Sequence, residues 1–418
     1  MKILADRNIP LAEELFGSLG DVVLVEGRDV TESFPNLDQF DILAIRSVTR
    51  VTPKLVDRAV KAGVIATATI GTDHIDLPYI QEANRRRRSP ITVLSAPGSN
   101  ADSVADYIWY GLAYLTRGSE TPLNRKSLGI IGLGNCGSRV ARRAEGFGMR
   151  ILRYDPPLAE RDPLFTSDTF EDAMAADFVT LHVPLTQPCE SNYPTQHMIG
   201  AAALSLMKGH AYLLNASRGA VVDSRVLVRA LKDGAVAGAV LDVYEGEPQP
   251  APELISLPAL ATPHIAGYAI EAKRRGATAI YERVCRVLGI EPQDTRPLLL
   301  RGFDPPKGVQ VRFRTHGHGA ASAADADHAV RSLMASIHDI SATSRELKET
   351  LRFGRREELF DRMRRDYERD YARHELAFYR VGFDESVPPE LRAAVARRLE
   401  GFGIEVMDRE LHYVLSAS

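Results

Sequence analysis

Three polar side chains of complementary chemistry, Arg218, Glu247 and His264, each follow a short apolar run. A planar guanidinium can hold a carboxylate by two parallel hydrogen bonds. An imidazole is the side chain best matched to proton transfer near neutral pH. A carboxylate at Glu247 could hydrogen-bond that imidazole, fix its tautomer and stabilise its charged form. The trio therefore predicts oxidation or reduction of the carbon next to a substrate carboxylate, with His264 taking the hydroxyl proton in oxidation.

A glycine-rich segment upstream supplies a site for the hydride acceptor. The apolar run 128–131 leads into Gly-Leu-Gly-Asn-Cys-Gly at 132–137, and a helix-compatible stretch follows. In this context the first glycine permits a tight turn, the second lets a pyrophosphate approach the backbone, and the third allows close helix packing. The N-terminus of the helix offers free N–H groups to the anion. We predict cofactor contacts at Gly132, Gly134, Asn135, Cys136 and Gly137.

An acidic residue follows where a dinucleotide site requires one. Asp155 ends the next apolar run, at roughly the 20-residue spacing expected for the carboxylate that binds the ribose hydroxyls. A negative charge there would repel the 2′-phosphate of NADP, so NAD is the expected cofactor. Cys136 lies at a helix start, where the pKa of a thiol can be lowered. We interpret it as a small packing residue that the cofactor covers.

Two series of apolar runs must position these groups. Short apolar runs alternate with helical patterns, which favours parallel sheets covered by helices. Ligands of such sheets bind at the carboxyl ends of the strands, where the trio is expected. The predicted strands are 2–4, 22–25, 42–45, 64–66 and 91–94 in the first series, and 128–131, 151–154, 178–182, 211–215 and 239–243 in the second.

Two helical runs, 101–117 and 269–288, flank the second series and suggest that it is inserted into the first. A proline-rich linker then leads to an edge-like strand at 309–314. Leu359, Met363 and Tyr367 recur every four residues within 355–374, which predicts an amphipathic helix. Four arginines of this stretch alternate with acidic residues, so we expect them on a solvated face: Arg364, Arg365, Arg369 and Arg373. The predicted domains are 1–100 with 265–289 for the substrate, 101–264 for NAD, and 290–418 as a third domain.

Composition excludes several classes of protein. Hydrophobic residues make up 44% and charged residues 26%, with a net charge of -3, as in ordinary soluble globular proteins. No nucleic-acid partner or membrane span is expected, since no apolar run approaches the ~18 residues that a span needs. A cytoplasmic location is the expectation. Three scattered cysteines favour neither a disulfide framework nor zinc, and the pair His316 and His318 is too small a ligand set to predict a metal.

These motifs resemble those of the D-isomer-specific 2-hydroxyacid dehydrogenases over about residues 1–290. The resemblance implies two Rossmann-like or flavodoxin-like, doubly wound parallel-sheet α/β domains, with Arg218, Glu247 and His264 as the catalytic residues. It also implies that Asp242 and Gly267 line the NAD site. Val183 stands where many relatives have a threonine beside the cofactor; a backbone contact there could survive, whereas a hydroxyl contact could not.

Within the family, the chain is most similar to members that oxidise a phosphorylated four-carbon hydroxy acid in the biosynthesis of pyridoxal 5′-phosphate. This similarity lies in the segments 46–49, 67–74, 155–157 and 264–268. It implies substrate contacts at Ser47, Thr67 and Tyr268, and Arg46 could complete a phosphate cradle. The third domain resembles their C-terminal α+β dimerisation domain, notably at 360–371 and 397–406, so a homodimer is implied.

Two alternative functions are also consistent with the sequence. One is another enzyme of the same chemistry, such as a 3-phosphoglycerate dehydrogenase with a C-terminal regulatory domain, although the third domain lacks a clear βαββαβ order. The other is a non-catalytic protein that senses NAD and binds protein partners. The run Arg85 to Arg88, which looks like a local insertion, could form a different phosphate cradle, but we interpret it as an exposed loop of solvated charge.

Overall fold

The computed structural model describes residues 1–300, 309–311, 322–351, 356–370, 373–384 and 387–407. The chain divides into two compact units. The first unit comprises residues 1–100 and 269–304, and the second comprises residues 101–268 and those after 304. The sequence predicted a separate third domain from residue 290, whereas the structure groups the C-terminal residues with the second unit.

The first unit contains a five-stranded parallel sheet in the order β2-β1-β3-β4-β5. Successive side chains of a strand point to opposite faces. In β3, Ile42 and Ala44 accordingly join one apolar cluster and Leu43 and Ile45 join the other. Burial on both faces explains why the strands are continuous apolar runs. The strands are β1 (Lys2–Asp6), β2 (Asp21–Val25), β3 (Ile42–Ile45), β4 (Val64–Thr67) and β5 (Thr92–Leu94).

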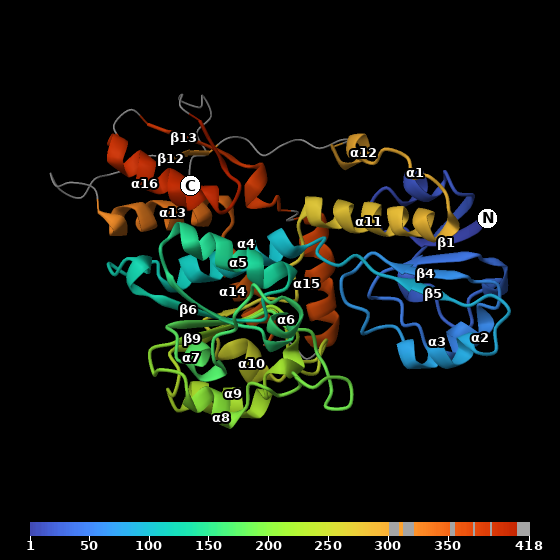
Figure 1. The fold of residues 1–418 in the computed structure, drawn as a ribbon, viewed down its shortest axis with the longest axis horizontal. Helices are drawn as coiled ribbons and strands as arrows, with labels where there is room; N and C mark the ends of the chain where they lie inside the picture. Colours follow the sequence, from blue (N-terminus) through green and yellow to red (C-terminus); the bar gives the residue numbers. More distant parts are fainter. Residues whose placement is uncertain (301–308, 312–321, 352–355, 371–372, 385–386, 408–418) are drawn as a thin grey trace. The chain divides into compact units, whose positions relative to one another are not determined.

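Helices cover both faces of this sheet (Figure 1). Helices α1 (Ala12–Phe16) and α11 (Ile270–Leu288) supply residues to the apolar cluster on one face. Helices α2 (Pro53–Arg58) and α3 (Leu77–Asn84) supply residues to the cluster on the other. A short helix, α12 (Arg296–Leu300), follows α11. The doubly wound arrangement predicted for this unit is confirmed.

The second unit contains a six-stranded parallel sheet in the order β11-β10-β9-β8-β6-β7. The chain reverses its direction of travel across the sheet between β6 and β8, and ligands of doubly wound folds bind at such a switch point. For strand β11 the sequence indicated only that His264 follows a short apolar run, and it predicted no bounds, because two residues are too few to show a pattern. The strands are β6 (Ser127–Ile131), β7 (Arg150–Tyr154), β8 (Phe178–Leu181), β9 (Tyr212–Asn215), β10 (Gly238–Leu241) and β11 (Leu260–Ala261).

Two apolar clusters sandwich this sheet as well. The cluster on one face includes residues of α4 (Ala101–Leu115) and α5 (Asn135–Gly146). On the other face lie α7 (Phe170–Met174), α8 (Ala201–Ser205), α9 (Ser224–Lys232) and α10 (Pro252–Ser256). Helix α6 (Pro156–Arg161) follows β7 directly. No described helix has the length and apolar character required to span a membrane.

The C-terminal residues add a three-stranded parallel sheet in the order β12-β13-β14. Strand β12 lies at its edge, as the sequence predicted; residues 312–314 of that prediction, and His316 and His318, lie outside the described residues. The strands are β12 (Val309–Val311), β13 (Arg380–Phe383) and β14 (Glu405–Met407). The helices are α13 (Ala323–Ile337), α14 (Ile340–Thr350), α15 (Arg356–Asp370) and α16 (Pro389–Glu400).

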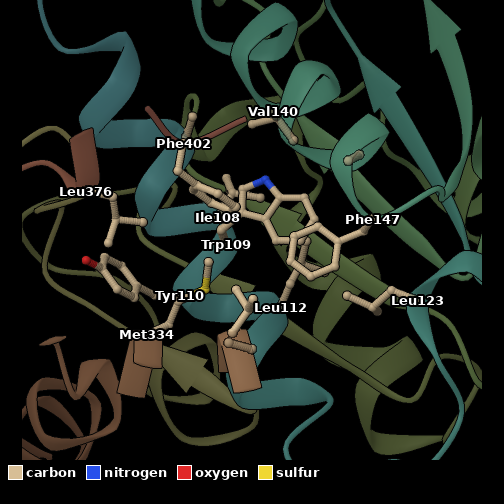
Figure 2. Packing of buried hydrophobic residues seen from close by; sticks show 14 of the residues in the cluster. Ile108, Trp109, Tyr110, Leu112, Leu123, Val140, Phe147, Met334, Leu376 and Phe402 are labelled. Atoms are coloured by element: carbon tan, nitrogen blue, oxygen red, sulfur yellow. The ribbon is translucent and has the colours of Figure 1, made fainter. Parts of the chain in front are cut away.

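A shared aromatic core explains why these residues belong to the second unit (Figure 2). Trp109 of α4 stacks on Phe147, with ring centroids 4.6 Å apart, and meets the edge of Phe402 at 5.4 Å. Phe402 comes from the C-terminal part of the chain. Because the cluster runs from α4 and α5 into α13 and α16, removing the C-terminal residues would expose this apolar surface to water.

The sequence predicted solvated arginines in two segments, 355–374 and 85–88, and in both segments the structure contradicts this for particular residues. Arg373 is buried, and its guanidinium donates to the carbonyl and hydroxyl oxygens of Ser103, so it does not lie on a solvated face. Arg364 is half-buried and contacts Tyr268. Arg87, expected in a solvated loop, donates from Nη2 to the carbonyls of Ala59, Val60 and Ala62, each at 2.9 Å. It thereby satisfies backbone carbonyls at and beyond the C-terminal end of α2, where few intrahelical donors remain.

Candidate active site

The glycine-rich turn after β6 has the geometry of a pyrophosphate cradle. Gly132 has a φ of 92°, in the left-handed region, and a Cβ atom there would lie 2.7 Å from the carbonyl oxygen of His182. A Cβ atom at Gly137 would lie 1.9 Å from the carbonyl oxygen of Gly132. At Gly134, by contrast, a Cβ atom would meet nothing within 4 Å. Packing therefore requires the first and third glycines, whereas the second leaves open space in front of the turn.

The N-terminus of α5 lies at this open space. Gly134 is its N-cap residue and has no side chain that could cap the first turn. Backbone N–H groups at an uncapped helix start favour an anion, both as donors and through the helix dipole. The turn and the helix together fit the pyrophosphate of a dinucleotide.

Asp155 lies beside the turn, as the sequence predicted. Its Oδ2 atom accepts a hydrogen bond from the backbone N–H of Leu133 at 2.7 Å, and Oδ1 accepts one from Leu158 at 2.9 Å. The carboxylate thus braces the glycine turn and caps α6. Each carboxylate oxygen has two lone pairs, so ribose hydroxyls could still donate to it.

Two residues that were predicted to contact the cofactor, Val183 and Cys136, lie at this turn. The Cγ1 atom of Val183 would lie 2.9 Å from a Cβ atom at Gly132, so Val183 packs beside the first glycine. Burial raises the pKa of the Cys136 thiol to about 11. The thiol therefore stays protonated at neutral pH, which supports its interpretation as a packing residue and not as a nucleophile.

A compact loop after β9 presents Arg218. The buried Asn215 side chain donates from Nδ2 to the carbonyl of Arg218 at 3.0 Å and accepts from the backbone and hydroxyl of Ser217. A Cβ atom at Gly219 would lie 1.9 Å from the carbonyl carbon of Tyr244, so this loop packs tightly against the segment that carries Glu247. The half-buried Arg218 is positioned by backbone contacts on both sides.

Glu247 and His264 form the hydrogen bond that the sequence predicted, with Oε2 and Nδ1 separated by 2.7 Å. The other carboxylate oxygen accepts the backbone N–H of Tyr244 at 2.7 Å. Burial by itself raises the pKa of Glu247, but the charge of His264, these hydrogen bonds and the charge of Arg364 outweigh it and lower that pKa. Because a carboxylate accepts from Nδ1, Nε2 is the atom left to exchange a proton with substrate.

Asp242 shapes the loop that presents His264. This fully buried carboxylate accepts the hydroxyl of Thr262 at 2.7 Å and the backbone N–H groups of Ile265 and Ala266 at 2.8 Å. The hydroxyl of Tyr107 lies 2.6 Å from that of Thr262 and extends the network to α4. His264 itself has a φ of 57°, an uncommon backbone conformation that these surrounding contacts hold. This positioning role for Asp242 was not predicted.

Tyr268 lies beside an arginine that the sequence reasoning placed elsewhere. Arg364 of α15 donates from Nη2 to the Tyr268 hydroxyl at 3.3 Å. The Tyr268 ring also approaches that of Tyr367, with centroids 6.5 Å apart. Arg364 follows the buried Met363 and lies between Phe360 and Tyr367 at spacings of four and three residues. The sequence did offer a signal for this position of Arg364, because the arginine lies within an apolar stripe of the helix.

The remaining predicted residues lie in the first unit. Arg46 and Ser47 follow β3, and Thr67 ends β4 paired with Ile45, so the three lie at one edge of the sheet. The fully buried Thr67 hydroxyl lies 2.7 Å from that of Thr69 and 3.1 Å from Nε2 of His74.

The direction of these hydrogen bonds follows from one carbonyl. The Thr69 hydroxyl donates to the carbonyl of Gly71, so it accepts from Thr67, and Thr67 in turn accepts from His74. The one proton of the Thr67 hydroxyl is therefore donated to Thr69, and one of its two lone pairs accepts from His74. A direct contact from this hydroxyl to substrate stays a prediction. Among the described residues there is no cluster of three metal-ligating side chains.

Sequence comparisons relate this chain to known proteins. Residues 102–266 match the family model for the NAD binding domain of D-isomer specific 2-hydroxyacid dehydrogenases. An erythronate-4-phosphate dehydrogenase of Salinibacter ruber is 47% identical over 296 residues, which cover 70% of this chain and 73% of the relative. One of Shewanella baltica is 35% identical over 381 residues, covering 90% and 95%.

Solved structures share the fold. The TT0316 protein of Thermus thermophilus is similar with a TM-score of 0.57 and 29% identity, over 70% of this chain and 99% of that one. A D-lactate dehydrogenase of Aquifex aeolicus, complexed with NAD and lactic acid, has a TM-score of 0.56 and 26% identity, over 72% and 98%.

Proposed function

Because the chain belongs to the family of the erythronate-4-phosphate dehydrogenases, among the D-isomer specific 2-hydroxyacid dehydrogenases, we propose that it oxidises 4-phospho-D-erythronate. The product is the 2-oxo acid 3-hydroxy-2-oxo-4-phosphooxybutanoate, in the route to pyridoxal 5′-phosphate. The 2.7 Å pair of Glu247 and His264, in the same unit as a dinucleotide cradle, carries this proposal.

Each residue of the candidate site has a separate role in the proposed reaction. NAD, when bound, supplies the acceptor for the hydride from the substrate C2 atom. Arg218 binds the C1 carboxylate, and Nε2 of His264 accepts the proton of the C2 hydroxyl. Glu247 stabilises the imidazolium that results. Gly132, Gly134, Gly137 and Asp155 hold the cofactor, with Asn135, Cys136, Val183, Asp242 and Gly267 as further proposed contacts.

The phosphate end of the substrate requires a second set of contacts, because Arg218 accounts only for the carboxylate. We assign these contacts to Arg46, Ser47, Thr67 and Tyr268, on the resemblance to the family's motifs. The hydrogen bond from His74 to Thr67 indicates that His74 positions this threonine. A homodimer formed through the C-terminal residues and a cytoplasmic location remain proposals based on the same resemblance.

Substrate comparison tests the proposal. Turnover of 4-phospho-D-erythronate, followed at the nicotinamide absorbance with 2-oxo acids added as acceptors, should exceed that of 3-phosphoglycerate. Inactivity on both would overturn the substrate assignment. His264→Ala should lower kcat by roughly 10²–10⁴-fold while leaving NAD affinity nearly unchanged. Full activity in this variant would exclude the mechanism, and NAD binding by a wild type that turns over no hydroxy acid would favour an NAD sensor.

A further inference from the structure

We propose that Arg364, on α15, binds the phosphate group of the substrate together with Tyr268 and so determines specificity for a phosphorylated hydroxy acid. This inference rests on the proposed function and adds a residue from the C-terminal part of the chain to the site. It is carried by three observations: where α15 packs, what the guanidinium contacts, and which of its atoms is left without a hydrogen bond.

Helix α15 is packed against the segments that carry the catalytic residues. Phe360 is buried and meets the ring of Tyr244 edge-on, with centroids 5.9 Å apart. The backbone N–H of Tyr244 is the donor to Glu247. Near the other end, Tyr367 is buried beside Tyr268. Because Arg364 lies four residues after Phe360 and three before Tyr367, it lies on the same face of the helix.

The guanidinium is only partly satisfied by the protein. Its Nη2 atom donates to the Tyr268 hydroxyl at 3.3 Å, a long hydrogen bond. Its Nε atom is buried and has no hydrogen-bond partner among the described residues. A buried polar atom without a partner is unfavourable, and native structures keep one chiefly where a ligand or water completes it. The side chain as a whole is half-buried, so part of it remains accessible.

Charge also favours an anionic ligand. Burial by itself lowers the pKa of Arg364, but Tyr268, Glu247 and Asp361 outweigh it and raise that pKa, so the guanidinium stays charged. A planar guanidinium presents parallel N–H donors that match the oxygens of a phosphate. The phenol of Tyr268 is a second donor, four residues beyond His264 on the same loop. Two donors beside the reacting end suit a short substrate with a terminal phosphate.

A matched pair of variants tests this inference. Arg364→Gln removes the charge, whereas Arg365→Gln removes the same charge from an exposed position on the same helix. With 4-phospho-D-erythronate, KM should rise roughly 10- to 100-fold in Arg364→Gln and stay near the wild-type value in Arg365→Gln. With unphosphorylated D-erythronate, the difference in KM between Arg364→Gln and Arg365→Gln should be much smaller, because this substrate has no phosphate group for Arg364 to bind. Arg364→Lys should recover part of the affinity, and thermal unfolding establishes that each variant is folded.

The outcomes separate the possible roles. An equal loss on both substrates, with a shifted pH profile of kcat, would mean that Arg364 acts through Glu247 and would overturn the inference. An unchanged KM would overturn it too. If wild-type enzyme does not oxidise 4-phospho-D-erythronate, the proposed function fails independently. Calorimetric titration with inorganic phosphate then decides: weaker binding in Arg364→Gln than in Arg365→Gln would support a phosphate site, and equal binding would exclude it.

Discussion

The Nδ1 atom of His264 lies 2.7 Å from one carboxylate oxygen of Glu247, and the backbone N–H of Tyr244 holds the other oxygen at the same distance. Both carboxylate oxygens are therefore fixed, and the imidazole is held in a single tautomer. The segment that carries Glu247 also packs against Gly219, next to Arg218. Three elements that follow different strands are thus joined at the candidate site.

Glu247→Gln should lower kcat by roughly tenfold or more, because a neutral amide stabilises an imidazolium less than a carboxylate does. The measurement is kcat across pH with saturating NAD. Glu245→Gln is the matched control, since the half-buried Glu245 pairs with a different histidine, His197, at 2.8 Å. Equal losses in the two variants would argue against a specific role for Glu247.

The glycine turn yields a second prediction. Gly137→Ala should destabilise the fold by about 1–3 kcal/mol, because its Cβ would overlap the carbonyl oxygen of Gly132. Gly134→Ala should leave stability nearly unchanged and weaken NAD binding, since its Cβ would enter only the open space. Thermal unfolding and calorimetric NAD titration check the two effects. Tight NAD binding by Gly134→Ala would contradict the assigned position of the pyrophosphate.

The ion pair between α5 and α4 should be important for stability. Arg143 and Asp106 are 1% and 0% exposed, with Nη2 and Oδ1 separated by 2.8 Å. Arg143→Met would leave a buried carboxylate without this partner and should cost about 3–5 kcal/mol in urea unfolding. Arg153→Met, in a pair exposed by 35% and 57%, should cost at most about 1 kcal/mol. Similar costs for the two variants would contradict this assignment.

His338 makes stability depend on pH. Burial, with a contribution from Arg373, lowers the pKa of His338 to about 3 from the ordinary 6.5. Below pH 6.5 the unfolded chain therefore binds a proton that the folded protein does not, so stability falls as pH falls from 6.5 towards 3.

Removing this imidazole tests the effect. Partial exposure of the side chain reduces the expected loss between pH 7 and 5 to about 1–2 kcal/mol. His338→Gln, which keeps an acceptor for the Tyr367 hydroxyl, should flatten the pH dependence of the urea midpoint by that amount. His328→Gln, at an exposed position on α13, is the matched control. The same slope in wild type and His338→Gln would exclude His338 as the source.

The sequence by itself determined the two doubly wound sheets, the glycine turn with Asp155, and the strand ends that carry Arg218, Glu247 and His264. These features are local: apolar periodicity defines each strand, glycine spacing defines the turn, and parallel strands bring their carboxyl ends to one edge.

Tertiary structure decided what periodicity cannot encode. The packing of Trp109 against Phe402 joins the C-terminal residues to the second unit across nearly 300 positions of sequence. The burial of Arg364 and Arg373 within a charged stretch depends on Tyr268 and Ser103, which lie far away in the chain. A helical pattern shows which residues share a face, but only the partner that packs on that face determines whether an arginine there meets water or the site.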